Sequence, residues 1–197
     1  FKIAVSGALE DRAATQWNDV GLHVLRNEAG EIGFKVMVGG GMGRTPVIAT
    51  TIRDFLPWQE ILNYIEAIVR VYNRWGRRDN KYKARIKILV KAEGQRYIDE
   101  VETEYREIVE LDGAPHTLTQ AELDRVSASF VPPTLAAPEQ AAINTVAINP
   151  TPKEAIEYAR WLKQNVAPHK NPDLRAVTLS FKRLGQAPGD ATADQLN

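Results

Sequence analysis

The pattern of apolar and polar residues predicts that the chain begins with a half-buried strand over residues 1–6. Phe1, Ile3 and Val5 alternate with Lys2 and with small residues. Successive side chains of a strand point to opposite faces of its sheet. We therefore expect the apolar set to face a core and Lys2 to point away from it.

The remaining pattern divides into strands, helices and loops that alternate along the chain. Extended segments are predicted over 20–26, 32–38, 47–52 and 174–183. Apolar residues at helical spacing predict helices over 57–75, the second half of 77–91, 95–111, 118–130 and 152–164. Loops are predicted over 7–19, 27–31, 39–46 and 166–173. Pro57 is expected at the first position of its helix, and Gly76 should end that helix.

This order of elements predicts an α+β protein with an antiparallel sheet and packed helices, followed by the start of a second α+β unit. The stretch 131–151 is rich in Pro, Ala, Thr and Asn, which is typical of a linker. It separates a predicted domain over 1–130 from a second over 152–197. Because the chain starts in a predicted strand and ends in a predicted helix start, we expect it to be a piece of a longer protein.

Composition excludes several classes of site and of partner. The 25 basic and 25 acidic residues cancel, which argues against a dedicated nucleic-acid-binding protein. The sequence has no cysteine, so its own thiolates cannot hold an iron–sulfur cluster. Its three histidines are widely spaced, so no metal site is predicted. No membrane-spanning run or signal peptide is visible, and we expect a cytoplasmic protein.

A glycine-rich loop over 39–46 is the first candidate for chemistry. Gly39, Gly40 and Gly41 would allow the backbone to approach a ligand closely, and Arg44 could pair with an anion. The loop matches neither a P-loop nor a dinucleotide fingerprint. A purely structural loop explains these glycines equally well.

A basic stretch is the second candidate. Nine Lys or Arg residues and one acid lie between Arg70 and Lys91. If 81–91 is helical, Lys81 and Arg85 share a face, as do Lys83 and Lys87. Such a patch suits a polyanion, namely a phosphate backbone or a cofactor with many carboxylates. Residues 93–112 hold eight acids and two bases, so a solvated face balanced by this segment is the competing interpretation.

Several stretches, taken in order, resemble the siroheme-binding region of nitrite and sulfite reductases. These are FKIAVSG at 1–7, VGGGMGRTP at 38–46 and WGRRDNKYKARIK at 75–87. Two later stretches, VTLSFK at 177–182 and PGDATADQ at 188–195, resemble the start of the second ferredoxin-like half-domain of these enzymes. Each match is weak alone, and the ordered set is specific.

The resemblance implies a function and a set of site residues. Members of the family reduce sulfite or nitrite by six electrons at a siroheme coupled to a 4Fe–4S cluster, with a ferredoxin or a flavoprotein as electron donor. Lys2 matches the second lysine of a Lys-Phe-Lys stretch that holds the anion. Arg85 matches a basic position that binds siroheme carboxylates, with Arg44, Lys81, Lys83 and Lys87 as helpers. Gly39, Gly40 and Gly41 would let the backbone pass close to the macrocycle.

The chain departs from the family pattern in two ways. The cysteines that bind the cluster lie further downstream in the family, and an upstream half-domain contributes arginines to the anion site. We therefore expect the isolated chain to bind siroheme weakly or not at all, and to be inactive. Two alternatives stay open: a non-catalytic anion- or RNA-binding module that uses the basic stretch 70–91, and a purely structural scaffold.

Overall fold

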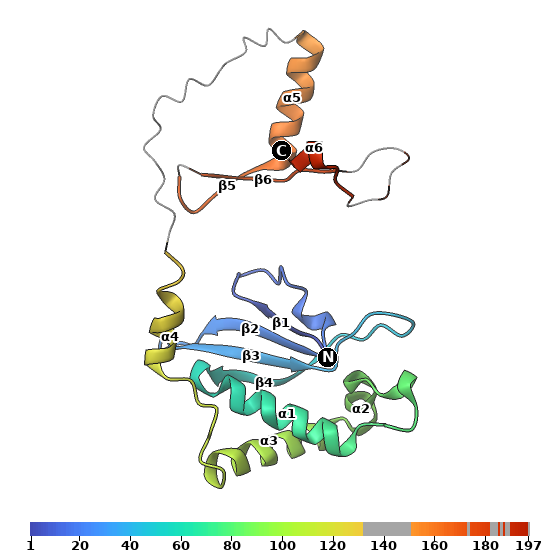
Figure 1. Ribbon diagram of the computed structural model, residues 1–197, viewed down its shortest axis with the longest axis vertical. Helices are drawn as coiled ribbons and strands as arrows, with labels where there is room; N and C mark the ends of the chain where they lie inside the picture. The colour runs from blue at the N-terminus through green and yellow to red at the C-terminus, as the bar shows by residue number, and fades with distance from the viewer. Residues whose placement is uncertain (132–150, 173, 182–184, 186, 188–189, 197) are drawn as a thin grey trace. The chain divides into compact units, whose positions relative to one another are not determined.

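The computed structural model describes residues 1–131, 151–172, 174–181, 185, 187 and 190–196 (Figure 1). Contacts divide the chain into two compact units, Phe1–Pro132 and Pro133–Asn197. The predicted linker over 131–151 lies almost wholly outside the described residues and stays a prediction.

The first unit is built on a four-stranded sheet with the strands in sequence order. They are β1 (Ile3–Ser6), β2 (Val20–Arg26), β3 (Ile32–Val38) and β4 (Thr50–Pro57). The predicted antiparallel arrangement is confirmed for β2, β3 and β4, and β1 joins the edge of the sheet parallel to β2. A parallel pair needs a long crossover, which the predicted loop over 7–19 provides together with the short helix η1 (Thr15–Trp17).

The apolar residues of β1 lie on the core side of the sheet but remain exposed. Ile3 pairs with Val20 and Val5 pairs with Leu22, and both β2 residues are buried. Residues paired across neighbouring strands share a face. Ile3 is nevertheless 45% exposed and Val5 52%. The set therefore lies on the predicted side of the sheet, but the expectation that a core covers it is wrong, because the helices pack on β2, β3 and β4 and leave the edge strand uncovered.

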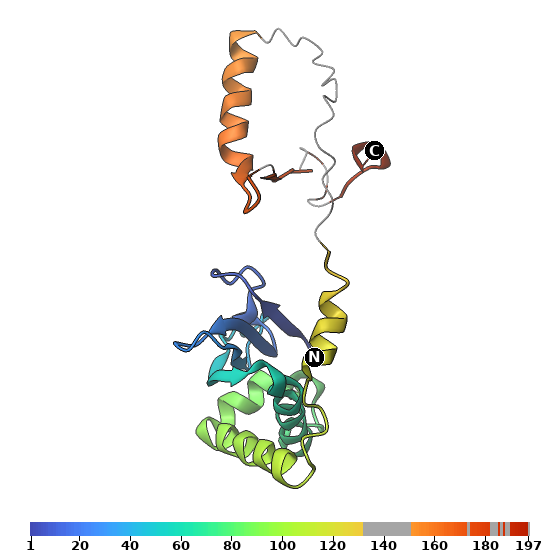
Figure 2. The same ribbon diagram turned by 90° about the vertical axis from the view of Figure 1, so that its left-hand side faces the viewer.

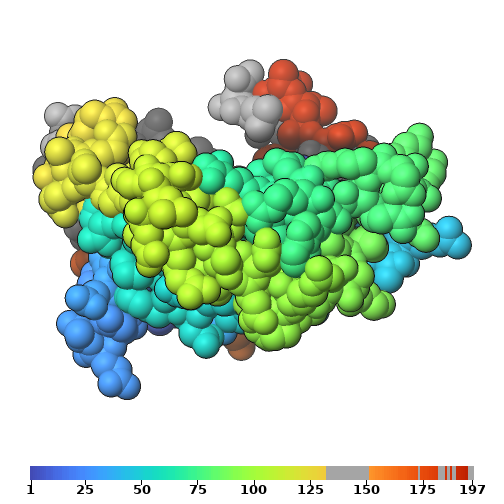
Figure 3. Space-filling view, turned by 90° about the horizontal axis from the view of Figure 1, so that it is seen from below, coloured from blue at the N-terminus to red at the C-terminus, as the bar shows by residue number. Residues whose placement is uncertain are grey.

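Helices cover one face of the sheet (Figures 1 and 2). They are α1 (Ile61–Trp75), α2 (Ile86–Glu93) and α3 (Gln95–Glu110), and α4 (Gln120–Ser127) follows them in the chain. Figure 3 shows α1 and α3 side by side on the face of the unit that lies away from the sheet. The predicted helices over 95–111 and 118–130 are confirmed to within a few residues at their ends.

Two helix starts differ from the prediction. Pro57 ends β4 with a ψ of 140°, so it cannot be the first residue of a helix. The chain turns instead through η2 (Trp58–Glu60) before α1 begins. In the basic stretch, η3 (Lys81–Lys83) and α2 are separate elements, so Lys81 and Arg85 do not share one helix face as expected.

The core lies between the sheet and helices α1, α2 and α3. The Tyr97 hydroxyl donates a hydrogen bond to the Ile68 carbonyl at 3.2 Å, and Tyr64 packs edge-on against Tyr105. Burying one large apolar side chain stabilises the fold by about 1.5–3 kcal/mol, so this cluster is the main source of stability. Its fully buried members include Val20, Val36, Val38, Leu56, Tyr64, Ile68, Val71, Tyr97, Val101 and Ile108.

The second unit contains α5 (Pro152–Asn165), β5 (Val166–Pro168), β6 (Arg175–Val177) and α6 (Ala193–Leu196). The helix predicted over 152–164 is confirmed, and Thr151 and Glu154 form a capping box at its start.

The strand prediction in this unit is partly wrong. Residues 166–168 form a strand where a loop was expected, and the described part of the strand expected over 174–183, residues 174–181, is extended only at Arg175–Val177. The reason is that β5 follows α5 directly and offers only three residues for pairing. No described side chain of this unit is buried. The start of a ferredoxin-like half-domain therefore stays a prediction.

Candidate functional site

One end of the sheet brings together the three segments that carry the predicted site residues. Asp19, which directly precedes β2, lies at this junction and is 4% exposed. Its carboxylate accepts a hydrogen bond from the backbone N–H of Lys2 at 2.9 Å and from the Arg85 guanidinium at 2.8 Å. Its backbone carbonyl accepts from the N–H of Gly39 at 3.0 Å. The start of β1, the glycine loop and the start of α2 therefore meet at one residue.

The Arg85 guanidinium is held by Asp19 on one side and is exposed to solvent on the other. It is the N-cap residue of α2, and its side chain is 43% exposed, whereas the Asp19 carboxylate is 6% exposed. A guanidinium carries five N–H donors, and the ion pair with Asp19 occupies only its Nη2 group. The remaining donors are able to bind a carboxylate or another oxyanion from the exposed side.

The three glycines lie against atoms of their own chain. A Cβ on Gly40 would lie 2.3 Å from the Gln16 carbonyl oxygen, and a Cβ on Gly41 would lie 3.1 Å from an Arg85 guanidinium nitrogen. Gly39 has a φ of +86°, which favours glycine, and its own Cβ would lie 3.0 Å from Val90. Gly39 is thus favoured by its backbone conformation and Gly40 by close backbone packing, whereas Gly41 leaves room for the side chains of Lys87 and Arg85.

Lys87 fastens the glycine loop to α2. Its ammonium group donates to the Thr45 carbonyl at 2.6 Å and to the Met42 carbonyl at 3.2 Å, and the residue is 7% exposed. Two of its three protons are used by the loop. Lys87 therefore holds the loop that carries Arg44, which is a different role from the predicted direct contact with cofactor carboxylates.

The other predicted basic residues are exposed. Lys2, Arg44, Lys81 and Lys83 all have side chains open to solvent, and Lys81 lies 5.2 Å from the ring centre of Tyr82. Asn80 caps η3 by accepting the backbone N–H of Tyr82 at 2.9 Å. Charged heads in this setting are free to reorient toward an anion.

The first part of the basic stretch is paired with acids of α3 and its surroundings. Arg70 contacts Glu66, Glu104 and Asp112, and Arg74 contacts Glu104. These hydrogen bonds raise the pKa of Arg70, with the bond to Asp112 as the largest cause. Further along, Arg77 donates to the carboxylate of Asp79 at 2.7 Å and lowers the pKa of Asp79 to about 2. The positive charge of 70–79 is therefore largely compensated locally.

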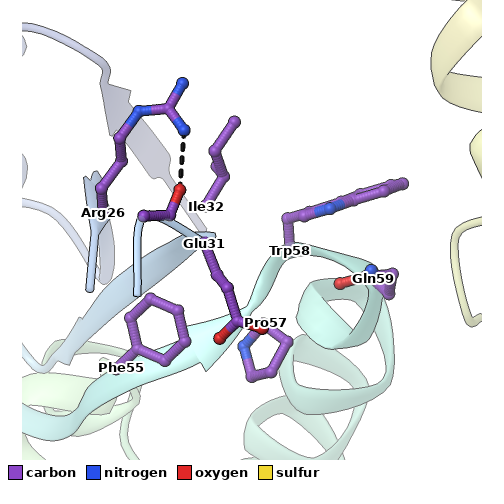
Figure 4. Close-up of a pocket in the computed structure, with 8 residues that line it drawn as sticks. Arg26, Glu31, Ile32, Phe55, Pro57, Trp58 and Gln59 are labelled. Carbon is purple, nitrogen blue, oxygen red and sulfur yellow. Dashed lines mark hydrogen bonds between the residues drawn. The ribbon is translucent and has the colours of Figure 1, made fainter. Parts of the chain in front are cut away.

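A surface hollow of the described residues lies elsewhere. It has a volume of about 410 Å³ and is lined by the hairpin between β2 and β3 and by residues around the end of β4. Figure 4 shows Arg26 donating back to the hairpin backbone, at 2.8 Å from the Gly30 carbonyl. None of the predicted site residues lines this hollow, and its one arginine and one glutamate form no constellation typical of catalysis.

Among the described residues, no group of three or more His, Cys, Asp or Glu residues could hold a metal ion. No helix in the described part of the chain is long and apolar enough to cross a membrane.

Sequence analysis missed Asp19. It lies in a stretch predicted to be irregular, and nothing in its neighbourhood distinguishes it from a surface acid. Its two partners, the backbone N–H of Lys2 and the guanidinium of Arg85, lie 17 and 66 positions away in the sequence. Only the tertiary structure could identify it.

Residues 1–108 match the family described as the nitrite and sulphite reductase 4Fe-4S domain. A sulfite reductase (ferredoxin) of Synechococcus elongatus is 38% identical over 97 residues, which are 46% of this chain and 16% of the relative. An assimilatory ferredoxin-dependent nitrite reductase of Haloferax mediterranei is 37% identical over 111 residues, 53% and 19% of the two chains. A sulfite reductase (NADPH) hemoprotein beta-component of Shewanella sediminis is 32% identical over 101 residues, 48% and 18%.

The chain thus spans less than a fifth of the length of each of these relatives. The matched region contains every predicted site residue, from Lys2 to Lys87. The family description names a 4Fe–4S domain and one relative is named a hemoprotein, which agrees with the predicted siroheme and 4Fe–4S cluster, although this chain has no cysteine for the cluster. On the match over more than half of its length, the chain belongs to the nitrite and sulfite reductase family.

Proposed function

We propose that the chain forms one wall of the siroheme pocket in a sulfite or nitrite reductase. In this proposal Lys2 binds the substrate anion and Arg85 binds a carboxylate of the cofactor. The electrons come from a ferredoxin or a flavoprotein, since relatives are named for ferredoxin or NADPH. The whole reductase, and not this chain alone, would carry out turnover.

The observation that carries the proposal is the meeting of Lys2 and Arg85 at Asp19. These residues lie 83 positions apart in the sequence (85 − 2), yet one carboxylate contacts both. Each of them was assigned from a separate stretch of family resemblance. Their convergence in space is what a single anionic ligand site requires.

The residues present fit a cofactor that carries many carboxylates. Arg85 has outward-facing donors, and Arg44, Lys81 and Lys83 add exposed cations from two neighbouring loops. Lys87 fits only indirectly, because the glycine loop uses its ammonium group. Siroheme, coupled to the 4Fe–4S cluster, would pass the six electrons of the reduction from the electron donor to the bound anion.

The chain's own contribution is binding and charge. An exposed ammonium at Lys2 attracts sulfite or nitrite and stabilises negative charge that develops on a departing oxygen. A lysine is also a proton donor, and each oxygen that leaves needs protons. The backbone bond from Lys2 to Asp19 fixes where this side chain starts, at the edge of the sheet.

The test is to express the complete reading frame that contains this segment and to compare three variants. Lys2→Met should lower the turnover of sulfite or nitrite with a reduced dye by about 10²–10³-fold, the loss typical of one oxyanion donor, while siroheme content stays normal. Arg85→Gln should lower siroheme content, read from the visible absorbance of the purified protein. Lys91→Met removes an exposed lysine of α2 and should change neither.

Equal behaviour of Lys2→Met and Lys91→Met would contradict the substrate role of Lys2. Normal siroheme content in Arg85→Gln would contradict the cofactor role of Arg85. The isolated 197-residue chain should show no turnover, and measurable activity with a reduced dye would refute that expectation.

The RNA-binding alternative is supported by only part of the basic stretch 70–91. Arg70, Arg74 and Arg77 of the basic stretch are engaged by carboxylates of the same unit. A nucleic-acid surface needs cations that are free to neutralise phosphates.

A further inference from the structure

The candidate site contains a buried carboxylate, which is unexpected in a pocket for anions. Asp19 is 4% exposed and lies directly behind the two residues that are proposed to bind negative groups. A negative charge at this position weakens the attraction of the pocket for any anionic ligand. Its presence therefore calls for a role that outweighs this electrostatic cost.

Geometry gives Asp19 such a role. The two oxygens of its carboxylate are divided between two partners, with Oδ2 on the Lys2 N–H at 2.9 Å and Oδ1 on the Arg85 guanidinium at 2.8 Å. Its carbonyl holds the Gly39 N–H at 3.0 Å, and the Lys2 carbonyl accepts the N–H of Val20 at 3.1 Å. Asp19 therefore holds Lys2, which directly precedes β1, and Arg85, which directly precedes α2, at the same point.

The long side chain of Arg85 makes this tie important. An arginine loses much conformational entropy when it is held in one rotamer, and a half-exposed arginine has many rotamers available. The ion pair with Asp19 selects rotamers in which one Nη group points inward and the rest of the fork points outward. Gly41 leaves room for this orientation, because a side chain there would meet the guanidinium at 3.1 Å.

We propose that Asp19 is a positioning residue that pre-orients Arg85 and the backbone of Lys2 for an anionic ligand. This inference rests on the proposed function for the identity of the ligand, but the positioning itself is a property of the chain alone. Asp19 does not touch the ligand. It acts through Arg85 and through the start of β1.

The positioning is measured first on the 197-residue chain without any ligand. In the unmodified chain, amide hydrogen exchange of Lys2 should be slowed relative to an unstructured peptide, and NMR should resolve the Arg85 side-chain N–H signals in slow exchange. In Asp19→Asn both the Lys2 protection and the resolved Arg85 signals should be reduced. Asp54→Asn makes the same charge change at an exposed position of β4 and should leave both unchanged.

Ligand binding then separates positioning from charge. The probe is siroheme, titrated by visible absorbance into the complete reductase after removal of its cofactor. A positioning role predicts that Asp19→Asn weakens siroheme binding by on the order of tenfold or more, as is typical for a residue that orients a ligand-binding group. A pure charge effect predicts tighter binding, because a negative charge is removed. Asp54→Asn should bind siroheme as the unmodified protein does.

A double variant tests whether Asp19 acts through Arg85. In an Arg85→Gln background, Asp19→Asn should cause little further loss of siroheme affinity, because the group that it positions is already absent. Additive losses would overturn the proposal, as would tighter siroheme binding in Asp19→Asn. Fast exchange of the Lys2 amide in the unmodified chain would overturn it as well, and this measurement needs no variant that might fail to fold.

The two proposals fail in distinguishable ways. If the complete protein binds no siroheme while the Lys2 amide and the Arg85 signals respond to Asp19→Asn, the positioning is upheld and the proposed function is wrong. If siroheme binds normally and neither signal responds, the proposed function survives and Asp19 is not a positioning residue.

Discussion

Gly40 is a glycine of the candidate site whose replacement should disturb the first unit directly. Its φ is not in the left-handed region, so alanine can adopt its backbone conformation. The obstacle is space, because a Cβ would lie 2.3 Å from the Gln16 carbonyl oxygen and 2.8 Å from that of Asn18. Ordinary contact begins at 3.4 Å, so Gln16 would have to move by 1.1 Å (3.4 − 2.3). Both obstructing atoms are backbone and cannot rotate away.

The cost of Gly40→Ala follows from what that movement breaks. Overpacking in a well-packed site costs about 1–3 kcal/mol. The Gln16 carbonyl accepts a hydrogen bond from the Ala49 N–H at 2.8 Å, and its loss adds about 1 kcal/mol. Alanine also reduces the conformational entropy of the unfolded chain, which stabilises the folded state by about 0.4–1 kcal/mol. We expect a net loss of about 1–3.6 kcal/mol in the free energy of unfolding.

Denaturant unfolding followed by tryptophan fluorescence measures this loss. A Trp161→Phe background leaves Trp17, Trp58 and Trp75 as reporters, all in the first unit, and Trp17 is next to Gln16. Gly7→Ala is the matched control, because a Cβ there would meet no atom within 4 Å. It should change stability by no more than about 0.5–1 kcal/mol. The change in midpoint at constant slope gives the free-energy difference.

If Gly40→Ala and Gly7→Ala unfold at the same denaturant concentration, the packing argument is refuted. The glycine loop would then owe its glycines to a ligand rather than to its own chain, which is one of the two interpretations that the sequence leaves open.

Two further predictions concern the helical face of the unit. Glu104→Gln should lower the free energy of unfolding by about 1–3 kcal/mol in the same assay, because Glu104 is buried between Arg70 and Arg74 and loses its charge-assisted hydrogen bonds. Glu66→Gln removes an exposed partner of Arg70 and should cost less than about 1 kcal/mol. Equal costs of the two variants would contradict the importance of burial. Burial raises the pKa of Tyr64 and of Tyr97, so the folded state disfavours their ionisation. Their contribution to stability is complete below the unfolded pKa of about 10 and is lost as the pH rises above it, because the unfolded chain ionises first. The free energy of unfolding, measured from about pH 8 to about pH 11 on either side of the ordinary tyrosine pKa of about 10, should show this decline. Tyr97→Phe should make the decline less steep, and an unchanged slope in that variant would contradict a contribution from Tyr97.

Much of the fold could be predicted from the sequence because it depends on local periodicity. Helices α1, α3 and α5 carry apolar residues at helical spacing, and β2 and β3 are apolar runs on either side of a turn. Such patterns are read within a window of a few residues. The family resemblance, and with it the cofactors, also came from short stretches of sequence in a fixed order.

Contacts between distant segments decided the rest. Whether Ile3 and Val5 are covered depends on how far the helices extend over the sheet, and no pattern within β1 encodes that. From the sequence Lys87 is indistinguishable from an exposed cation, and only the structure shows its hydrogen bonds to the glycine loop. From the sequence Asp19 is indistinguishable from a surface acid, because its partners Lys2 and Arg85 lie 17 and 66 positions away. The sequence by itself determined most of the elements and the family. The positions of the site residues were decided only by the tertiary structure, because hydrogen bonds and ion pairs depend on distances between atoms that are remote along the chain.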